Sequence, residues 1–317
     1  MYFSRIRIQP EIYKSTQFAK VLSDNTYSKH RLLWDLFPGQ AKRDFLYREE
    51  IAREQIGIRA GVRGEPIYYI VSATAPFSKS PFFQVETREY QPKLQQGDRL
   101  RFELRANPIV TTKVDRENSE HYLRERSRRK AADKNKLTKK RVRHDVVMNT
   151  QRTFLTSLCT ELKLQSILSS TPKKQEYKKV LLAHGGLALD KRLTALLKDD
   201  FRYSERLNHT MALYDKLEWS IKAIIDASLD KWMVRQGERN AFLVLKDNND
   251  QLKLQNSAYQ WHALMQKKFK GKKSGFSSVD FVGDLEITDV EVFKKALFEG
   301  IGRSKAFGCG LMLVKRI

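Results

Sequence analysis

Alternation between apolar and charged residues in two distant segments constrains the fold of this chain more than any other feature. Residues 99–105 have the sequence RLRFELR, and residues 279–287 have the sequence VDFVGDLEI. A period of two places the apolar side chains on one face of a β-strand and the charged ones on the other. The sequence therefore predicts half-buried strands near both ends of the chain, each of which needs an apolar layer to cover it.

Further strands and a helix are predicted at each end. Short runs with strand character occur at residues 4–8, 67–71, 242–245, 252–254 and 311–314. A helical stripe at 32–37 ends at Pro38-Gly39, and a capping box of Thr288 and Glu291 opens a helix that ends at Gly300. Few strands with a helix on one face indicate an α+β protein built from tandem ferredoxin-like (RRM-like) modules.

The middle of the chain differs from both ends. Residues 113–143 hold thirteen Lys or Arg and five Asp or Glu with few large apolar residues, so this segment is expected to be either an arm that touches phosphates or a solvated loop. Residues from 151 to 235 have helical periodicity and predict an inserted bundle of three to five helices. The predicted organisation is an N-terminal module at 1–112, a basic linker or arm at 113–150, a helical insertion in the C-terminal half at 151–235, and the remainder of the C-terminal module at 236–317.

The charge of the chain points to a polyanionic partner. With 60 Lys and Arg against 37 Asp and Glu, the formal net charge is +23. Cations that neutralise phosphates release condensed counterions, which favours nucleic acid as the partner. No stretch approaches the length of a membrane helix, and two cysteines 150 positions apart, Cys159 and Cys309, exclude a disulfide framework and a Cys-based zinc site. We expect a cytoplasmic protein with no membrane partner.

A glycine-rich segment lies between the last predicted helix and the last strand. Residues 300–311 read GIGRSKAFGCGL, so four glycines stand among basic residues. Glycines permit close backbone approach, and successive N–H groups can form a nest for an anion. A tight turn that packs against the neighbouring module fits the same residues. The spacing of a P-loop is absent.

Four segments in order resemble the CasE family, the endoribonuclease of CRISPR subtype I-E. They are the opening MYFSR, the segment KHRLLWDLFP at 29–38 followed by RDFLY at 43–47, the segment GDRLRFELRANP at 97–108, and the glycine-rich segment. The resemblance covers about residues 1–155 and 230–317, so this chain is enlarged relative to the family.

The resemblance implies a metal-independent endoribonuclease that needs no cofactor. It would cleave CRISPR repeat stem-loops in precursor transcripts and stay bound to the crRNA with the other subunits of a Cascade-type surveillance complex. His30 falls on the family's catalytic position, and Tyr27, one helical turn earlier, is a candidate second catalytic group. An imidazole suits the removal of a proton from a 2′-hydroxyl near neutral pH. The other five histidines show no metal-ligand spacing and are expected to be surface or packing residues.

RNA binding is predicted for thirteen residues spread over four elements. They are Lys29 and Arg31 beside His30; Arg99, Arg101 and Arg105 on the charged face of their strand; Lys267, Lys268, Lys270, Lys272 and Lys273 in a basic turn; and Arg303, Ser304 and Lys305 in the glycine-rich segment. A flexible lysine turn suits an RNA stem, which offers phosphates and shape more than readable base edges.

Two other functions fit the residues. A catalytically silent RNA-binding or assembly subunit could keep the modules without the cleavage, although the presence of His30 argues against it. A DNA-binding protein could use the basic arm at 113–143.

Overall fold

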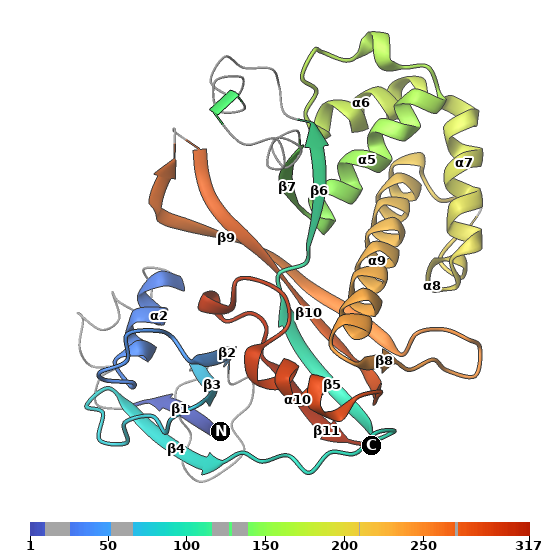
Figure 1. The fold of residues 1–317 in the computed structure, drawn as a ribbon. Helices are drawn as coiled ribbons and strands as arrows, with labels where there is room; N and C mark the ends of the chain where they lie inside the picture. Colours follow the sequence, from blue (N-terminus) through green and yellow to red (C-terminus); the bar gives the residue numbers. More distant parts are fainter. Residues whose placement is uncertain (10–25, 52–65, 116–126, 129–138, 209, 270–271) are drawn as a thin grey trace. The chain divides into compact units, whose positions relative to one another are not determined.

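The computed structural model describes residues 1–9, 26–51, 66–115, 127–128, 139–208, 210–269 and 272–317 (Figure 1). The chain forms two compact units. Unit 1 contains residues 1–108 and 230–317, and unit 2 contains residues 109–229. The chain therefore leaves unit 1 after Pro108 and returns to it at Asp230.

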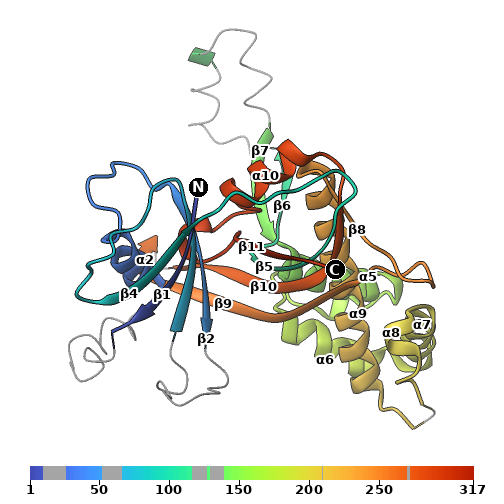
Figure 2. The ribbon, with the colours of Figure 1, turned by 90° about the horizontal axis from the view of Figure 1, so that it is seen from below.

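The first sheet of unit 1 has four strands and one helix. Its strands are β1 (Tyr2–Ile8), β2 (Phe45–Ile51), β3 (Pro66–Ser72) and β4 (Phe83–Glu89). They run side by side in the order β2-β3-β1-β4 (Figure 1), and all neighbours are antiparallel. Figure 2 shows β1, β2 and β4 of this sheet from a second direction. Helix α2 (Thr26–Trp34) follows β1 in the chain. This strand order is that of a ferredoxin-like module.

An apolar core joins α2 to this sheet. Leu33, Leu36 and Phe37 are buried against strand residues that alternate along β1 to β4. The opposite face of the sheet is apolar too, because Leu46 and Val71 pack with Leu311 at the end of the glycine-rich segment. Both faces of the first sheet are thus covered within unit 1.

In the second sheet, the two alternating segments at 99–105 and 279–287 are neighbouring strands. Its strands are β5 (Arg99–Ala106), β8 (Phe242–Val244), β9 (Leu254–Phe269), β10 (Lys272–Ile287) and β11 (Met312–Arg316). Their order is β11-β5-β10-β8, and β9 also pairs with β10. On the apolar face, Phe293 of α10 (Val290–Glu299) meets the Phe242 ring edge-on, and Trp232 at the end of α9 (Leu213–Arg239) stacks on Phe281.

Two details differ from the sequence predictions. The strand at 99–106 pairs with β10 and β11 and so belongs to the second module, whereas the predicted boundary at 112 placed it in the first. Alternation along a strand shows that one face is buried, but it does not show to which sheet the strand belongs. Helix α10 is capped by Asp289, whose carboxylate accepts from the N–H of Val292, and not by Thr288. An aspartate is as strong a cap as threonine, so adjacent candidates compete.

Unit 2 combines a two-stranded ribbon with helices. The ribbon pairs β6 (Ile109–Asp115) with β7 (Lys139–Asp145). The helices are α5 (Val146–Glu161), η2 (Gln165–Ile167), α6 (Lys174–His184), α7 (Gly186–Asp199), α8 (Phe201–Ser204) and the first part of α9. The helical insertion is therefore confirmed, but the inserted unit begins earlier, at residue 109, because both flanks of the basic segment are strands. Residues 116–126 and 129–138 of that segment lie outside the described residues.

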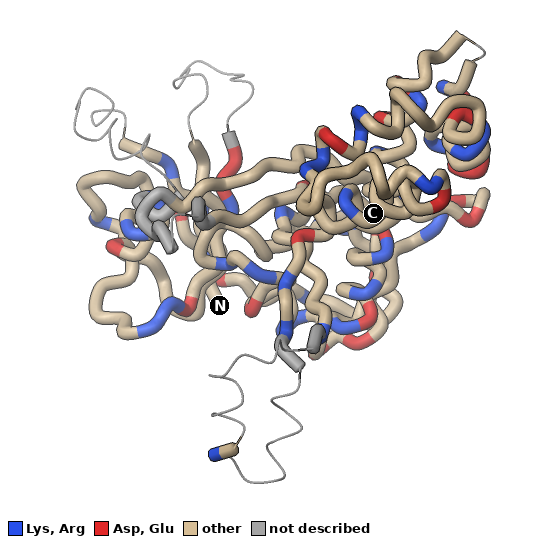
Figure 3. The backbone as a smooth tube through the Cα atoms, turned by 90° about the horizontal axis from the view of Figure 1, so that it is seen from above, with Lys and Arg blue, Asp and Glu red and all other residues tan. Residues whose placement is uncertain are grey.

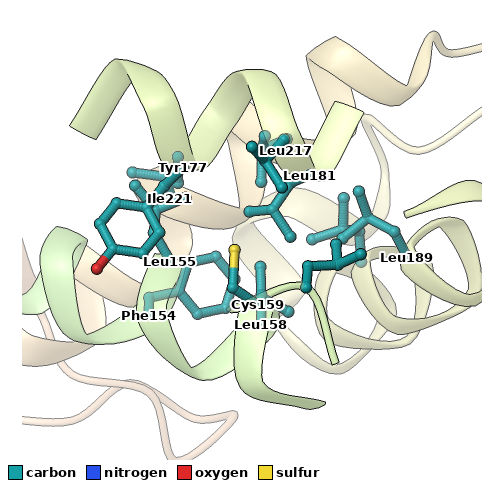
Figure 4. Close-up of a cluster of buried hydrophobic side chains, with 12 residues drawn as sticks. Phe154, Leu155, Leu158, Cys159, Tyr177, Leu181, Leu189, Leu217 and Ile221 are labelled. Atoms are coloured by element: carbon teal, nitrogen blue, oxygen red, sulfur yellow. The ribbon is translucent and has the colours of Figure 1, made fainter. Parts of the chain in front are cut away.

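Unit 2 has an apolar core of its own. Leu155, Leu158, Leu181, Leu189 and Leu217 are buried together from four helices, and the Cys159 thiol lies among them (Figure 4). A separate core explains why this insertion can interrupt the second module without disrupting it. Among the helices in the described part of the chain, none combines the length and apolar character that a bilayer span requires.

Candidate active site and RNA interface

His30 lies one turn into α2, where its ring belongs to a cluster with two aromatic side chains. The imidazole centroid is 5.4 Å from the Trp34 ring on the same helix and 6.1 Å from the Phe45 ring at the start of β2. The Trp34 and Phe45 centroids are also 6.1 Å apart, so the three rings form a triangle. The side chain of His30 as a whole is half-buried. The i, i+4 spacing places Trp34 beside His30, and the packing of α2 on the sheet brings Phe45 against both rings.

The Nε2 atom of His30 is buried and has no hydrogen-bond partner among the described residues. Burial lowers the pKa of His30, and the nearby guanidinium of Arg43 lowers it further. A lowered pKa keeps the imidazole neutral at neutral pH, which is the form that accepts a proton. A buried polar atom without a partner calls for an explanation, and a catalytic role is one such explanation.

Arg43 adds a cation to this region that the sequence patterns did not single out. Its Nη1 atom is buried without a partner among the described residues, and burial lowers the pKa of the Arg43 guanidinium. Burial lowers the pKa of Lys305, Glu299 raises it and Arg43 lowers it further, and the Lys305 Nζ donates to the carbonyl oxygen of Glu299 at 2.6 Å. Arg43 therefore acts electrostatically on both His30 and Lys305, and the two cations suit an anion.

The other predicted residues of α2 differ in their surroundings. Lys29 pairs with Glu49 of β2 at 2.6 Å, so its charge is already offset. Arg31 is exposed. Tyr27 belongs to the helix, but its side chain lies outside the described residues.

The glycine-rich segment packs against β2. Gly300 and Gly308 both have a φ of +81°; a Cβ on Gly300 would lie 2.9 Å from Leu46, and one on Gly308 would lie 3.2 Å from Tyr47. The Tyr47 hydroxyl donates to the carbonyl oxygen of Ala306 at 3.3 Å. The interpretation as a packing turn is confirmed. Packing also leaves Arg303 exposed, with no acidic partner among the described residues, while Ser304 is half-buried in a left-handed conformation.

A second histidine lies near the same elements. The Nε2 atom of His262, on β9, is 2.8 Å from the Ser278 hydroxyl. Its ring stacks on Phe276, which stacks on Phe307 of the glycine-rich segment (centroids 4.6 and 5.1 Å). Burial, then Arg105 and Lys29, lower the pKa of His262, while Glu49 and Asp280 raise it. This histidine was expected to be a surface or packing residue, and the residues beside it in the sequence carry no signal of these neighbours.

The arginines of β5 are paired with acids of β10. Arg105 makes two hydrogen bonds to Asp280 (2.7 and 2.8 Å) and one to the carbonyl oxygen of Glu49 (2.9 Å). Arg99 pairs with Glu286 at 3.0 Å, and the Arg101 Nη1 atom is 4.0 Å from Asp284. The predicted cationic face is therefore a mixed-charge ladder in the folded sheet. Arg105 ties β5 to both β10 and β2, which gives it a structural role.

The basic turn is the end of a long hairpin. β9 and β10 extend to residues 269 and 272, so the backbone of Lys267, Lys268, Lys272 and Lys273 is in strands (Figure 1). The side chains of these four lysines, and the whole of Lys270, lie outside the described residues. The predicted hairpin is confirmed, and the RNA contacts of its lysines stay a prediction.

Unit 2 carries exposed cations that the site prediction did not include. In the β6–β7 ribbon Lys113 pairs directly with Arg141, and Thr111 pairs with Arg143, so all four lie on one face. The three cations are exposed, and none has an acidic partner among the described residues. Elsewhere Lys and Arg are interleaved with Asp and Glu along the backbone (Figure 3). Like charges directly opposite each other are unfavourable unless an anion lies over them.

Comparisons with known proteins agree with this architecture. A family model described as CRISPR associated protein matches residues 1–316. Over 113 residues the chain is 33% identical to CRISPR system Cascade subunit CasE of Escherichia coli (strain K12), which covers 35% of this chain and 48% of that relative. The matched region thus spans about half the length of that curated relative.

Two solved structures show the same fold. CRISPR endoribonuclease Cse3 bound to 19 nt RNA has a TM-score of 0.53 and 21% identity, covering 99% of this chain and 100% of that chain. Thermus thermophilus Cse3, bound to an RNA representing a pre-cleavage complex, has a TM-score of 0.50 and 19% identity, covering 99% and 98%. The tandem ferredoxin-like fold predicted from the sequence is confirmed. Because the family model spans almost every residue, the chain belongs to the CRISPR associated protein family, and its resemblance to CasE is confirmed.

Proposed function

We propose that this protein is a metal-independent endoribonuclease that cleaves CRISPR repeat stem-loops in precursor transcripts and remains bound to the crRNA within a Cascade-type surveillance complex in the cytoplasm. The observation that carries this proposal is the half-buried imidazole of His30, whose pKa is lowered by burial and by the charge of Arg43, together with a buried nitrogen of Arg43 that has no partner among the described residues. A proton acceptor close to a guanidinium that still has a nitrogen to donate suits a reaction at a phosphodiester.

His30 acts as the general base in this scheme. The imidazole takes the proton of a 2′-hydroxyl, the 2′-oxygen forms a bond to the adjacent phosphorus, and the bond from phosphorus to the 5′-oxygen breaks. The products are a 2′,3′-cyclic phosphate and a 5′-hydroxyl, and the leaving oxygen takes a proton from an acid for which Tyr27 is the candidate. Arg43 and Lys305 offset the negative charge that develops on the phosphoryl oxygens.

The lysines of the β9–β10 hairpin and Arg303 extend the phosphate contacts along the RNA. The Arg303 side chain is exposed and has no acidic partner among the described residues, so its charge is available for a phosphate. Lys29 and the β5 arginines contribute less, since acids already pair with them. The exposed cations of the β6–β7 ribbon favour a phosphate-contacting surface over a plain solvated loop in the basic segment.

Replacing His30 tests the assignment. His30→Ala is expected to slow cleavage of a repeat hairpin by roughly 10²–10⁴-fold while leaving its binding intact, because the proton acceptor is removed but the phosphate contacts remain. Single-turnover cleavage in EDTA measures the rate, and His184→Ala on the exposed end of α6 is a control. Cleavage by His30→Ala at the normal rate would refute the role of His30.

The alternative is a non-catalytic RNA-binding or assembly subunit of the complex. A hairpin RNA with a 2′-deoxy nucleotide at the scissile position distinguishes the two. An endoribonuclease of the proposed type cuts the ribose form and only binds the deoxy form, whereas a silent subunit binds both and cuts neither.

A further inference from the structure

One of the four tryptophans is presented to solvent. Trp34 and Trp219 are partly buried and Trp232 is 6% exposed, whereas Trp261 of β9 is 48% exposed. Tyr259, two residues earlier on the same strand, is 42% exposed. Leaving an indole in water forgoes the large free energy that its burial provides, so an exposed one on an ordered strand is a candidate contact for a ligand.

The Trp261 ring is held in place by the strand beside it. A Cβ added to Gly275 of β10 would lie 2.5 Å from the Cζ2 atom of Trp261 and 2.7 Å from its Cε2 atom. Gly275 pairs with Ala263 in the hairpin register, so the indole of Trp261 lies across the backbone at a position with no side chain. One side of the ring is therefore packed, and the ring is ordered before any ligand binds.

The charge of the same hairpin suggests what covers the ring. Five lysines occupy positions 267–273, beginning six residues after Trp261. Six residues of extended strand span about 20 Å, so a nucleic acid strand of a few nucleotides can reach from the ring to the lysines. An aromatic ring and a run of cations on one hairpin match a ligand that combines flat apolar rings with phosphates, which is the chemistry of a nucleic acid strand with unstacked bases.

We propose that Trp261 is a stacking platform for an unpaired nucleobase of the bound RNA, on the same hairpin as the lysines proposed to hold the RNA backbone. This inference rests on the proposed function and adds to it a contact that paired bases inside a helical stem do not offer. The stack selects RNAs with a single-stranded nucleotide adjoining the stem, without regard to which base it is.

Binding of matched hairpins tests the platform. Affinities are measured in the His30→Ala background, so that cleavage does not intervene, for one repeat hairpin with a 5′ flank, a 3′ flank or no flank. Trp261→Ala is expected to weaken binding of one flanked RNA by roughly 5- to 100-fold and to leave the unflanked hairpin unchanged. Trp261→Phe keeps a ring and is expected to retain most of the affinity.

Two further variants separate stacking from simple loss of structure. Trp261→Leu keeps an apolar side chain beside Gly275 but has no flat ring, so it is expected to reproduce the Trp261→Ala defect. Tyr214→Ala, at an exposed aromatic residue of unit 2, is expected to have no effect. The proposal would be overturned if wild type and Trp261→Ala had equal affinities for every flanked RNA, or if the variant lost the same affinity with and without flanks. If Trp261→Ala then failed to bind the other Cascade subunits, the surface would be identified as a protein contact. If the His30→Ala protein bound no hairpin at all, the proposed function itself would fail.

Discussion

At the scale of single residues, the site depends on how burial tunes the protonation of His30. Its lowered pKa has two causes, which are desolvation of the half-buried ring and the neighbouring positive charge of Arg43. Both disfavour the imidazolium form, so both favour a base over an acid at neutral pH.

The pH dependence of cleavage follows from this direction. The rate is expected to fall as pH decreases through the pKa of His30, because protonation removes the base, and the inflection is expected below the ordinary histidine value of 6.5. A single-turnover pH–rate profile measures it. An inflection at or above 6.5, or a rate that rises as pH falls, would contradict a neutral His30 base.

Arg43 is expected to contribute to the rate and to the position of that inflection. Arg43→Gln removes a cation from the phosphate position and is expected to slow cleavage by roughly 10²–10³-fold. It also removes a charge that lowers the pKa of His30, so the inflection is expected to move to higher pH. Lys42→Ala, at the exposed neighbouring cation, is the matched control and is expected to change neither quantity. A slower rate without any shift of the inflection would place Arg43 away from His30.

At the scale of secondary-structure elements, the β5–β10 pair shows why a charged strand face is ambiguous. The arginines and the acids that pair with them occupy separate segments of the sequence, and the first segment alone looks cationic because Glu103 is its only acid. In the sheet Asp280 faces Arg105 and Glu286 faces Arg99 across the strands. The ladder therefore joins the segments before and after the insertion.

Stability measurements separate the members of this ladder. Arg105→Ala is expected to lower the free energy of unfolding by about 1.5–3 kcal/mol, because a partly buried guanidinium loses two carboxylate bonds and a carbonyl bond. Arg99→Ala is expected to cost at most about 1 kcal/mol, since that side chain is 64% exposed. Urea denaturation of unit 1, followed through its own tryptophans, provides the comparison. Equal destabilisation by the two variants would show that Arg105 does not anchor the sheet.

At the scale of the whole molecule, the net charge of +23 acts through the cations that lack acidic partners. Paired arginines contribute little to an RNA contact, because binding would first have to break their ion pairs. The hairpin lysines and the β6–β7 cations are therefore expected to dominate the salt dependence of binding.

The salt dependence of affinity checks this division. Replacing the five hairpin lysines with glutamine is expected to reduce the slope of log K against log salt by about 0.7–0.9 for each phosphate that the variant no longer neutralises. Replacing Lys113, Arg141 and Arg143 is expected to reduce it as well. The control replaces Arg99 and Arg101, which have acidic partners, and is expected to leave the slope nearly unchanged. If the control changed the slope as much as the lysine variant, the acids of β10 would not be neutralising these arginines.

The sequence by itself determined the local structure and the identity of the candidate base. Period-two alternation and short apolar runs predicted β1, β3, β5, β8, β11 and the second half of β10, helical periodicity predicted the bundle, and the motif around His30 identified the helix, because these signals depend only on neighbours along the chain. The strands β2 and β4 and most of β9 were not predicted from these patterns. Only the tertiary structure decided which sheet contains residues 99–106, which arginines are already paired, and that Arg43 and His262 lie near His30 and Lys29. Those facts depend on contacts between residues far apart in the sequence, and no local periodicity encodes them.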